Sequence, residues 1–546
     1  MSNEGTPVSE TGLDRRELLK RAGAVGAGAV VAGGLAGRAG ATVGKAAIHS
    51  ATPKRGGKIT WALEQDPGHI APFGGILTIT RTANELMYES LYEWDKNLNL
   101  NPALASKSDI KDAKTIDFTI RPGTKFSNGQ EVTADDVKYS FDLQLAPPLP
   151  GSVSVLGQVP SIAGIEVLSK YKARMHLKSA DARVFGYLAW QRYSSIVPKD
   201  MYTQVNAATQ GIGTGPYMLE GSYVPNDHLN YVRNPNYWKK GQPYLDAITY
   251  KIITDEQARI AALRAGAIDG ATVSVDSANA LKGVSGLKVL HNLTAAFREL
   301  QFTIKEGENK PWADRRVRQA INFAINRQDI LSKVYNGTGQ YSGHVASGYG
   351  PWVIPQKELK TKWEKYDLPK AKELMKAAGF SKGFDIQLST FSTPLDFPAM
   401  AALIQSYLKQ ININVNIVAQ DPATFAANNG KGNFEMDLTA RGMRGDVDGY
   451  VAEFNPTGAF GKTVYSTWFS GYQNKQMWRL VGNGRITLDP QKRLPMYQKL
   501  DRILMTELLE IPLVSVSKYQ VVNAKLQDMY VAFTDFNTGL RTAWLS

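Results

Sequence analysis

Two adjacent aspartates, Asp135 and Asp136, form the only Asp-Asp pair in the sequence of 546 residues. Paired carboxylates act as a general acid and base, bind a metal ion, or lie at the start of a helix. This pair follows a Ser-Asn-Gly turn at 127–129 and closes the sequence Thr-Ala-Asp-Asp at 133–136, which is typical of a capping box. We therefore predict that Thr133 and the two aspartates cap a helix and have no catalytic function.

Other residues that could do chemistry lack the arrangement that their chemistry needs. A Gly-x-Ser-x-Gly sequence at 379–383 follows a predicted helix and precedes a predicted strand, whereas a nucleophile elbow needs the reverse order. The six histidines are scattered, and none is spaced four residues from another as in a zinc-binding helix. The absence of cysteine excludes thiol nucleophiles, disulfides and Cys-based zinc sites. We therefore expect that the protein is not an enzyme. We also expect that it holds neither a cofactor nor a metal ion.

The size and charge of the chain limit the classes of function. A chain of 546 residues is too long for one compact core, so two or three domains are expected. The net charge is +13, but Lys and Arg are dispersed and never exceed two in a row. Because no basic patch is visible, we do not expect nucleic-acid binding.

Residues 1–41 resemble a twin-arginine export signal, in which Arg15 and Arg16 precede sixteen uncharged residues from Ala22 to Gly37. That apolar stretch is too short for a stable membrane span. A cleavage site of Ala-Gly-Ala type follows; an uncleaved weak anchor and an amphipathic or flexible tail are the alternatives. Since no cysteine can carry a lipid, we expect a soluble exported protein, periplasmic or otherwise extracytoplasmic, with residues 42–57 as a linker.

Strands and helices mix along the rest of the chain without an internal repeat, which indicates an α/β fold. Alternating apolar residues predict strands, and apolar stripes behind capping residues predict helices. The predicted strands are 58–63, 116–120 and 247–252, and the predicted helices are 84–91, 255–265 and those that begin at Asp314 and Asp489.

Several segments, in the order in which they occur, resemble the extracytoplasmic solute-binding proteins of ABC importers, family 5, the peptide/nickel-binding type. They include TIDFTIRPGTKFSNGQEVTADDVKYSF, GTGPYML, RNPNYW, DRRVRQAINFAINRQDIL and DPQKRLPMYQKLDRILMTELLEIPL. The resemblance covers nearly the whole chain after the linker. It implies a two-lobed fold like that of type II periplasmic binding proteins, in the large form with an extra subdomain in the first lobe.

The resemblance also implies domain boundaries and partners. The first lobe comprises 58–301 and 511–546, with the extra subdomain at about 92–205, and the second lobe comprises 302–510. Such lobes close by hinge motion on a small solute, which stabilises the closed form by bridging them. The expected partners are the permease subunits of an ABC importer and, during export, the twin-arginine translocase.

The same resemblance indicates a ligand-binding turn at 442–450. In peptide-binding relatives, an aspartate in a Gly-rich acidic turn receives the α-amino group of the ligand. Asp446 is at the matching position, although one spacer residue is missing and Gly449 replaces a proline. Arg441 and Arg444 flank it. Three interpretations stay open: Asp446 binds an ammonium group, pairs with an arginine, or is solvated. If it is paired, the site favours a neutral or anionic ligand held by an arginine.

Aromatic side chains are expected to form the walls of the site, because ligand sites are mostly apolar with few polar groups. Segments that approach the cleft in relatives contain the candidates Tyr349, Trp352, Trp468 and Tyr472. Core packing is the alternative for each of them. Glu64, just after the first strand, is the candidate from the first lobe.

The sequence thus predicts a substrate-binding protein that captures a small solute, with a peptide as the favoured ligand, and delivers it to an ABC permease. An oligosaccharide-binding or metal-chelate-binding protein of the same family is the alternative. An exported hydrolase on a two-lobed scaffold is the alternative from another class, although no activated nucleophile supports it.

Overall fold

The computed structural model describes residues 52–73, 78–144, 159–394, 396–451, 454–456, 465–534 and 537–546. The predicted export signal and residues 42–51 of the predicted linker lie outside the described residues. Residues 53–546 form one compact unit. At its start, Gly56 N donates to Tyr244 O and Gly57 N donates to Asp246 Oδ2, both at 2.9 Å. The end of the predicted linker is therefore held in place.

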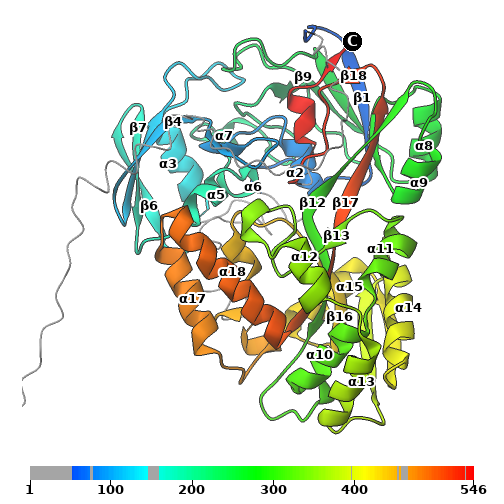
Figure 1. The fold of residues 1–546 in the computed structure, drawn as a ribbon. Helices are drawn as coiled ribbons and strands as arrows, with labels where there is room; N and C mark the ends of the chain where they lie inside the picture. Colours follow the sequence, from blue (N-terminus) through cyan, green and yellow to red (C-terminus); the bar gives the residue numbers. More distant parts are fainter. Residues whose placement is uncertain are drawn as a thin grey trace, which may run out of the picture. The chain divides into compact units, whose positions relative to one another are not determined.

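A mixed sheet, eleven strands wide over the described residues, organises this unit (Figure 1). Its strand order is β15-β14-β16-β12-β17-β11-β1-β10-β9-β8, and β13 pairs with β17 off this path. One side, half I, contains β1 (Lys58–Leu63), β8 (Tyr217–Leu219), β9 (His228–Arg233), β10 (Ala247–Ile252) and β11 (Gly270–Val273). The other side, half II, contains β13 (Gln340–Tyr341), β14 (Phe384–Phe391), β15 (Ile413–Gln420) and β16 (Met436–Arg441).

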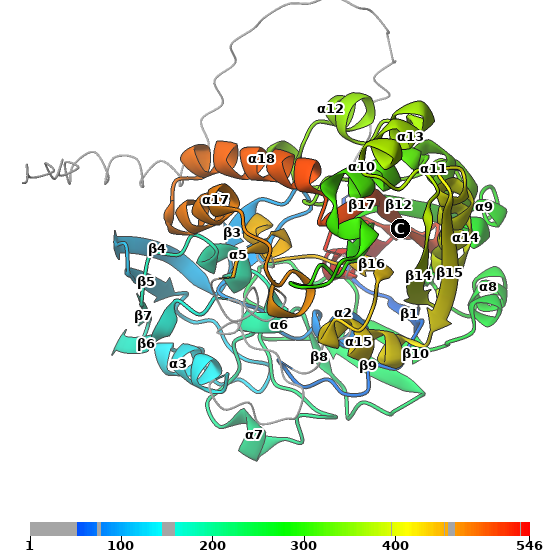
Figure 2. The same cartoon turned by 90° about the horizontal axis from the view of Figure 1, so that it is seen from below.

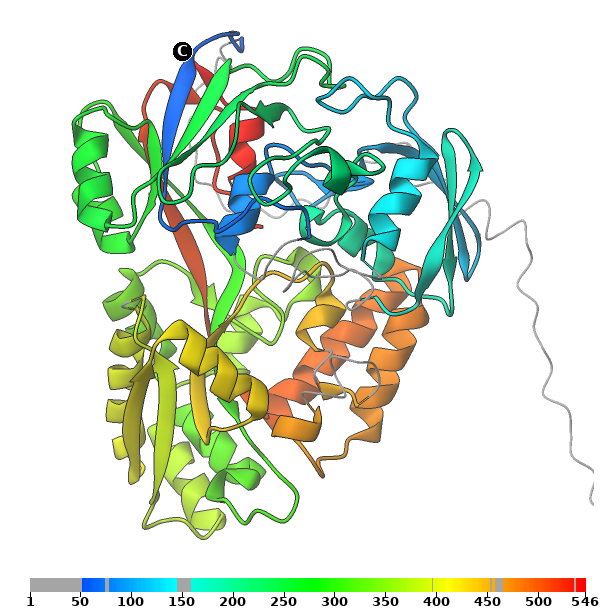
Figure 3. The same cartoon turned by 180° about the vertical axis from the view of Figure 1, so that it is seen from behind.

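Two long strands, β12 (Leu287–Phe302) and β17 (Glu510–Asn523), carry the chain from one half to the other (Figures 1 and 3). Residues 287–293 of β12 pair with 517–523 of β17, beside which β11 of half I extends the sheet. Residues 297–301 pair with 510–515, and β16 of half II pairs with the same part of β12. A register shift between Leu293 and Phe297 separates the two stretches.

Helices accompany both halves. Those of half I are α2 (Thr78–Asn84), α8 (Glu256–Arg264) and α9 (Val275–Ala280). Those of half II are α10 (Arg315–Ala324), α11 (Arg327–Tyr335), α12 (Gln356–Glu358), α13 (Leu368–Ala377), α14 (Asp396–Lys409), α15 (Pro422–Lys431), α17 (Lys475–Ile486) and α18 (Pro490–Glu507). Figures 1 and 2 show α17 and α18 packed side by side.

Short elements complete the chain. They are β2 (Tyr92–Trp94), β3 (Leu100–Pro102), β18 (Leu526–Gln527), β19 (Trp544–Leu545), a π-helical turn η4 (Leu359–Trp363) and the 3-10 turns η2 (Pro311–Ala313), η3 (Gly350–Trp352), η5 (Val447–Tyr450) and η7 (Thr538–Arg541).

A second, antiparallel sheet of four strands lies between β3 and β8 in the chain, with the order β4-β5-β7-β6. Its strands are β4 (Ala105–Asp112), β5 (Thr115–Ile120), β6 (Ile162–Ser169) and β7 (Lys172–Leu177). Helix α3 (Ala134–Asp142) packs on β6 and β7, and the short helices α5 (Val184–Leu188), α6 (Gln191–Ser194) and α7 (Met201–Gln204) follow. We call the described residues of 92–205 the small-sheet segment.

The apolar residues gather into distinct cores. One core joins half I to the small-sheet segment and contains Trp61 and Phe118. Half II has its own core, which contains Leu438. Along β12, Ala295 belongs to the first core, whereas Leu300 belongs to that of half II. Each half thus has its own core, although Met443 of half II belongs to the first one, and β12 changes cores where its register shifts.

Local sequence signals predicted most helix starts correctly. Asp255 accepts a hydrogen bond from Ala258 N, Asp314 from Arg316 N and Asp489 from Gln491 N, which confirms the predicted N-caps. The predicted strands at 58–63, 116–120 and 247–252 are also confirmed.

The helix predicted at 84–91 is wrong, because α2 ends at Asn84 and turns follow it. The backbone carbonyls of this stretch accept hydrogen bonds from distant segments: Leu86 O from Tyr217 N at 3.1 Å, and Met87 O from Gly215 N at 2.8 Å. Since these carbonyls pair elsewhere, they cannot continue a helical ladder.

Of the predicted capping residues, Thr133 and Asp136 form the capping box at the start of α3. Asp136 Oδ2 accepts from Thr133 N at 2.8 Å, and Oδ1 accepts from Lys199 N at 2.8 Å. Asp136 is buried, whereas Asp135 is exposed. One carboxylate therefore joins the helix start to the chain that leads into α7.

We predict that Asp136→Ala lowers the free energy of unfolding by about 2 kcal/mol, because two backbone N–H groups lose their acceptor. Urea denaturation measures the loss. Asp135→Ala is the matched control and should change stability by less than about 0.5 kcal/mol. Equal losses in the two variants would contradict the specific cap and indicate a general effect of charge near the helix start.

Candidate ligand-binding site

The turn that follows β16 lies where half II meets the small-sheet segment. Gly445 in this turn and Gly186 in α5 approach so closely that a Cβ on Gly186 would stand 1.9 Å from Gly445 O. A Cβ on Gly445 would stand 2.9 Å from the ring of Tyr187. Only glycine fits this backbone contact, so the turn at 441–450 is part of the interface between the two halves.

Asp446, the predicted contact for an ammonium group, lies in an internal ion pair with Arg493 of α18. Arg493 Nη1 donates to Asp446 Oδ2 at 2.7 Å, and Arg493 Nη2 donates to Oδ1 at 2.5 Å. The side chains are 12% and 6% exposed. Asp446 Oδ1 also accepts from Asp448 N at 2.8 Å. Of the three interpretations of the sequence, the structure has the arginine pair, but with an arginine that sequence reasoning did not name.

Arg441 does not pair with Asp446, although it is close to it in the sequence. Its guanidinium donates to Glu299 Oε1 at 3.0 Å and to Glu510 Oε2 at 2.7 Å, and all three side chains are buried. Burial raises the pKa of Glu510 to about 8, even though Arg441 acts in the opposite direction. Arg441 thus joins the ends of β16, β12 and β17, which indicates a structural role.

Asp448, which sequence reasoning missed, connects the two halves. It accepts from Arg485 Nε at 3.0 Å and from Tyr497 OH at 2.8 Å within half II, and Arg183 Nη1 of the small-sheet segment lies 3.5 Å away. Burial acts to raise the pKa of Asp448, but Arg485 and Arg183 outweigh it and hold the pKa below its ordinary value. No local sequence signal marks Arg183, because its partner is 265 residues away.

Two of the predicted aromatic residues lie beside this turn. Tyr349 OH donates to Arg444 O at 2.6 Å, and its ring centroid lies 5.4 Å from that of Tyr450. The guanidinium of Arg493 lies 5.7 Å from the ring centroid of Trp352. The structure therefore brings Tyr349 and Trp352 together with Arg444 and Asp446.

The remaining candidates are not brought to the turn. Trp468 packs against Phe434, and its Nε1 donates to Asn429 O at 2.9 Å. Tyr472 OH lies 3.6 Å from Met477 Sδ at the start of α17. Glu64 has no hydrogen-bond or ion-pair partner within the described residues. Trp468 is packed into a core and Tyr472 is half-buried against it, and roles of these residues and of Glu64 in ligand binding stay predictions.

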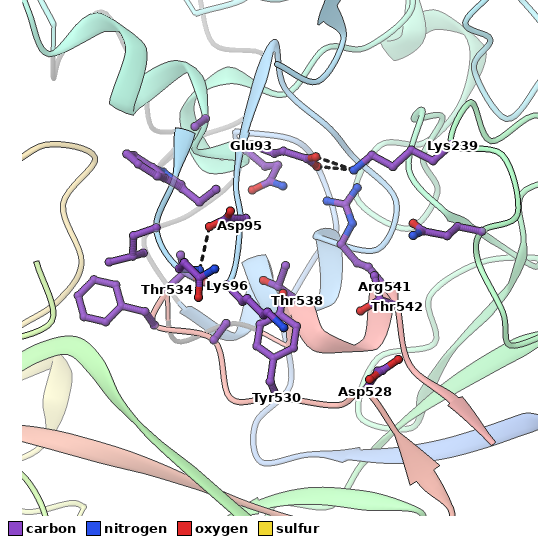
Figure 4. Close-up of a pocket in the computed structure, with 18 of the residues that line it drawn as sticks. Glu93, Asp95, Lys96, Lys239, Asp528, Tyr530, Thr534, Thr538, Arg541 and Thr542 are labelled. Carbon is purple, nitrogen blue, oxygen red and sulfur yellow. Dashed lines mark hydrogen bonds and ion pairs between the residues drawn. The ribbon is translucent and has the colours of Figure 1, made fainter. Parts of the chain in front are cut away.

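A pocket of about 500 Å³ opens in half I, between the small-sheet segment and the C-terminal residues 528–542 (Figure 4). Some of its charged side chains are paired: Lys239 Nζ donates to Glu93 Oε1 at 2.6 Å, and Arg541 binds Glu89 behind the pocket. Phe533 lines the pocket and also contacts Tyr349, at a centroid distance of 5.1 Å. The pocket therefore shares an aromatic side chain with the surroundings of the turn.

The residues that the structure describes contain neither a metal-binding cluster nor a membrane-spanning helix. In that part of the chain, no group of three or more His, Asp or Glu side chains is placed to hold a metal ion. No helix among the same residues is long and apolar enough to cross a membrane.

The profile of one protein family matches more than half of the chain. It is described as bacterial extracellular solute-binding proteins, family 5 Middle, and matches residues 99–473. Among curated proteins, the glutathione-binding protein GsiB of Salmonella typhi is 27% identical over 453 residues, which are 81% of this chain and 86% of that protein.

Solved structures show the same fold. The binding protein AgaA of A. tumefaciens, in complex with agropinic acid, matches with a TM-score of 0.73 at 24% identity. The match covers 90% of this chain and 99% of the AgaA chain. The protein DppA of Helicobacter pylori, in complex with the peptide STSA, matches with a TM-score of 0.72 at 24% identity. That match covers 90% of this chain and 98% of the DppA chain. These likenesses confirm the predicted α/β, two-lobed class of type II periplasmic binding proteins.

We predict that Asp446→Ala lowers the free energy of unfolding by about 3 kcal/mol or more, because Arg493 is left buried without its carboxylate. Chemical denaturation measures the loss. The double variant Asp446→Ala/Arg493→Met removes both charges and should recover much of the stability. A loss below about 1 kcal/mol in the single variant would contradict the buried pair.

Proposed function

Because the chain belongs to the bacterial extracellular solute-binding proteins of family 5, we propose that it captures a peptide between its two halves and delivers it to an ABC import permease. One observation supports a site between the halves: a turn of half II with charged and aromatic side chains lies directly against α5 of the small-sheet segment. The ligand class is supported by the names of similar proteins, one of which binds glutathione and another the peptide STSA.

The capture mechanism that we propose is closure about β12 and β17. Their ladder is interrupted between Leu293 and Phe297, where Thr294 Oγ1 donates to Val516 O at 3.3 Å. We place the bend there, slightly before the boundary at residue 302 expected from the sequence. The lobes at 58–301 with 511–546 and at 302–510 then move as units, each with its own core. A ligand of micromolar affinity supplies about −8 kcal/mol to hold the closed form.

Export through the twin-arginine route completes the proposal. The family is extracellular by description, and Arg15 and Arg16 before an Ala/Gly-rich segment support the route of export. The twin-arginine translocase is then the partner during export, and the permease is the partner afterwards. We propose no catalytic role. An oligosaccharide or a metal chelate is less well supported as the ligand, since the relative named above binds glutathione.

Thermal unfolding with a pool of tripeptides tests peptide capture. A peptide at 100-fold excess over its Kd should raise the free energy of unfolding by about 2.7 kcal/mol and therefore raise the Tm. Solution scattering with the same peptides should show a smaller radius of gyration than without them. An unchanged Tm with every peptide would overturn the peptide proposal, and a response to oligosaccharides instead would favour the alternative ligand.

The variant Gly186→Ala tests whether peptide binding requires the close contact between Gly186 and Gly445. The added Cβ would stand 1.9 Å from Gly445 O, so the closed contact cannot form without displacement, whereas alanine suits the helix that contains residue 186. We expect peptide affinity to fall at least about 10-fold with little loss of stability. Gly482→Ala in α17, where a Cβ meets nothing within 4 Å, is the matched control and should bind like the wild type. Equal affinity in both variants would argue against closure at this contact.

A further inference from the structure

The charged side chains of the turn differ in what they already bind. Asp446, Asp448 and Arg441 each lie in one of the buried ion pairs described above. Arg444 is the exception, because no carboxylate pairs with its guanidinium within the described residues. A guanidinium group that has no carboxylate partner in the protein can bind a carboxylate of the ligand.

The backbone holds Arg444 in position, while most of its guanidinium stays available. Its carbonyl oxygen accepts from Tyr349 OH at 2.6 Å, and its Nε donates to Gly449 O at 3.3 Å. A Cβ on Gly449 would lie 2.9 Å from Arg444 Cβ, so the stem of the side chain packs tightly against the backbone of the turn. The side chain is partly buried. The planar guanidinium group can therefore bind both oxygens of a carboxylate without a large loss of side-chain conformational freedom.

The surroundings leave the charge of Arg444 unbalanced. Glu510 is a neighbouring acid, and its burial raises its pKa to about 8 in spite of Arg441 and Arg444. The carboxyl group of Glu510 is bound by Arg441 Nη2 at 2.7 Å, and no ion pair joins it to Arg444 within the described residues. Tyr187 and Tyr450 also lie within the electrostatic reach of Arg444. Both tyrosines are buried, and a low local dielectric strengthens an interaction with an anion.

The acids that the structure describes in the turn at 441–450 are already neutralised by arginines. Asp446 is occupied by Arg493. In the adjoining pocket, Glu93 binds Lys239, and Asp528 accepts from Trp544 Nε1 at 2.9 Å. Asp95 accepts from Asn99 Nδ2 at 2.9 Å and from backbone N–H groups. Asp95 and Asp528 thus have only neutral donors, whereas in the described turn at 441–450 the one charge without an ionic partner is that of Arg444.

We propose that Arg444 is the charged contact for the ligand, and that the ligand presents a carboxylate to it and needs no free amino group. This inference rests on the proposed function, since it places the ligand between the two halves. Its ligand class is peptides and other small organic acids with an accessible carboxylate. The carboxylate lies at the interface, so binding by Arg444 acts on closure as well as on affinity.

Native mass spectrometry with one set of tripeptides in three chemical forms tests the inference. The forms are the unmodified peptide, the N-acetylated peptide and the C-terminal amide. The wild type should retain the first two about equally and the amide at least about 10-fold more weakly, because the amide lacks the charge that Arg444 binds. Arg444→Gln should lower the affinity for the unmodified peptide to that for the amide, and Arg444→Lys should recover only part of it.

The control is Arg479→Gln, which removes an exposed arginine from α17 and should keep the preference of the wild type. The inference is overturned if the amide binds as well as the free acid, if N-acetylation abolishes binding, or if Arg444→Gln keeps the preference. Retention of none of the three forms would instead overturn the proposed function, and the inference with it. Circular dichroism of each variant shows whether the fold is intact.

Discussion

The antiparallel pairing of β12 with β17 is the constraint on which the rest of the structure depends. Both halves of the sheet extend from these strands, half I through β11 and half II through β16. Hydrogen bonding along the pair resists sliding, but the interruption between Leu293 and Phe297 leaves a short stretch without a regular ladder. Since the cores on either side share few residues, this stretch is where bending costs the least.

A second constraint acts at the interface of the halves, where charges are removed from water. Taking Asp446 or Asp448 out of water is costly unless an arginine compensates it. Arg493 of α18 and Arg485 of α17 supply that compensation within half II. Arg183, held by Asp181 Oδ2 at 2.6 Å, approaches the same group from the other half. These pairs orient the turn at 441–450 and neutralise its acidic side chains, whereas Arg444 has no ionic partner among the residues that the structure describes.

Much of the local structure was predictable because it depends on residues that are close in sequence. The caps at Asp136, Asp255 and Asp489 follow from short side chains that satisfy backbone groups two or three residues away. The helix predicted at 84–91 failed because backbone carbonyls of Leu86 and Met87 pair with a segment more than a hundred residues distant. Neither propensity nor periodicity contains that information.

The candidate site shows the same division. The sequence alone determined the family, the fold class and the turn that contains Asp446, because motif order and residue types are local properties. Only the tertiary structure decided which charges neutralise one another: Arg493 is 47 residues from Asp446, and Arg183 is 265 residues from Asp448. Two nearby arginines, Arg441 and Arg444, were the obvious partners from sequence. Arg441 instead binds Glu299 and Glu510, and Arg444 has no ion pair within the described part of the chain. The physical reason is that ion pairs form between side chains that the packed helices and strands bring together, and closeness along the chain does not fix that choice.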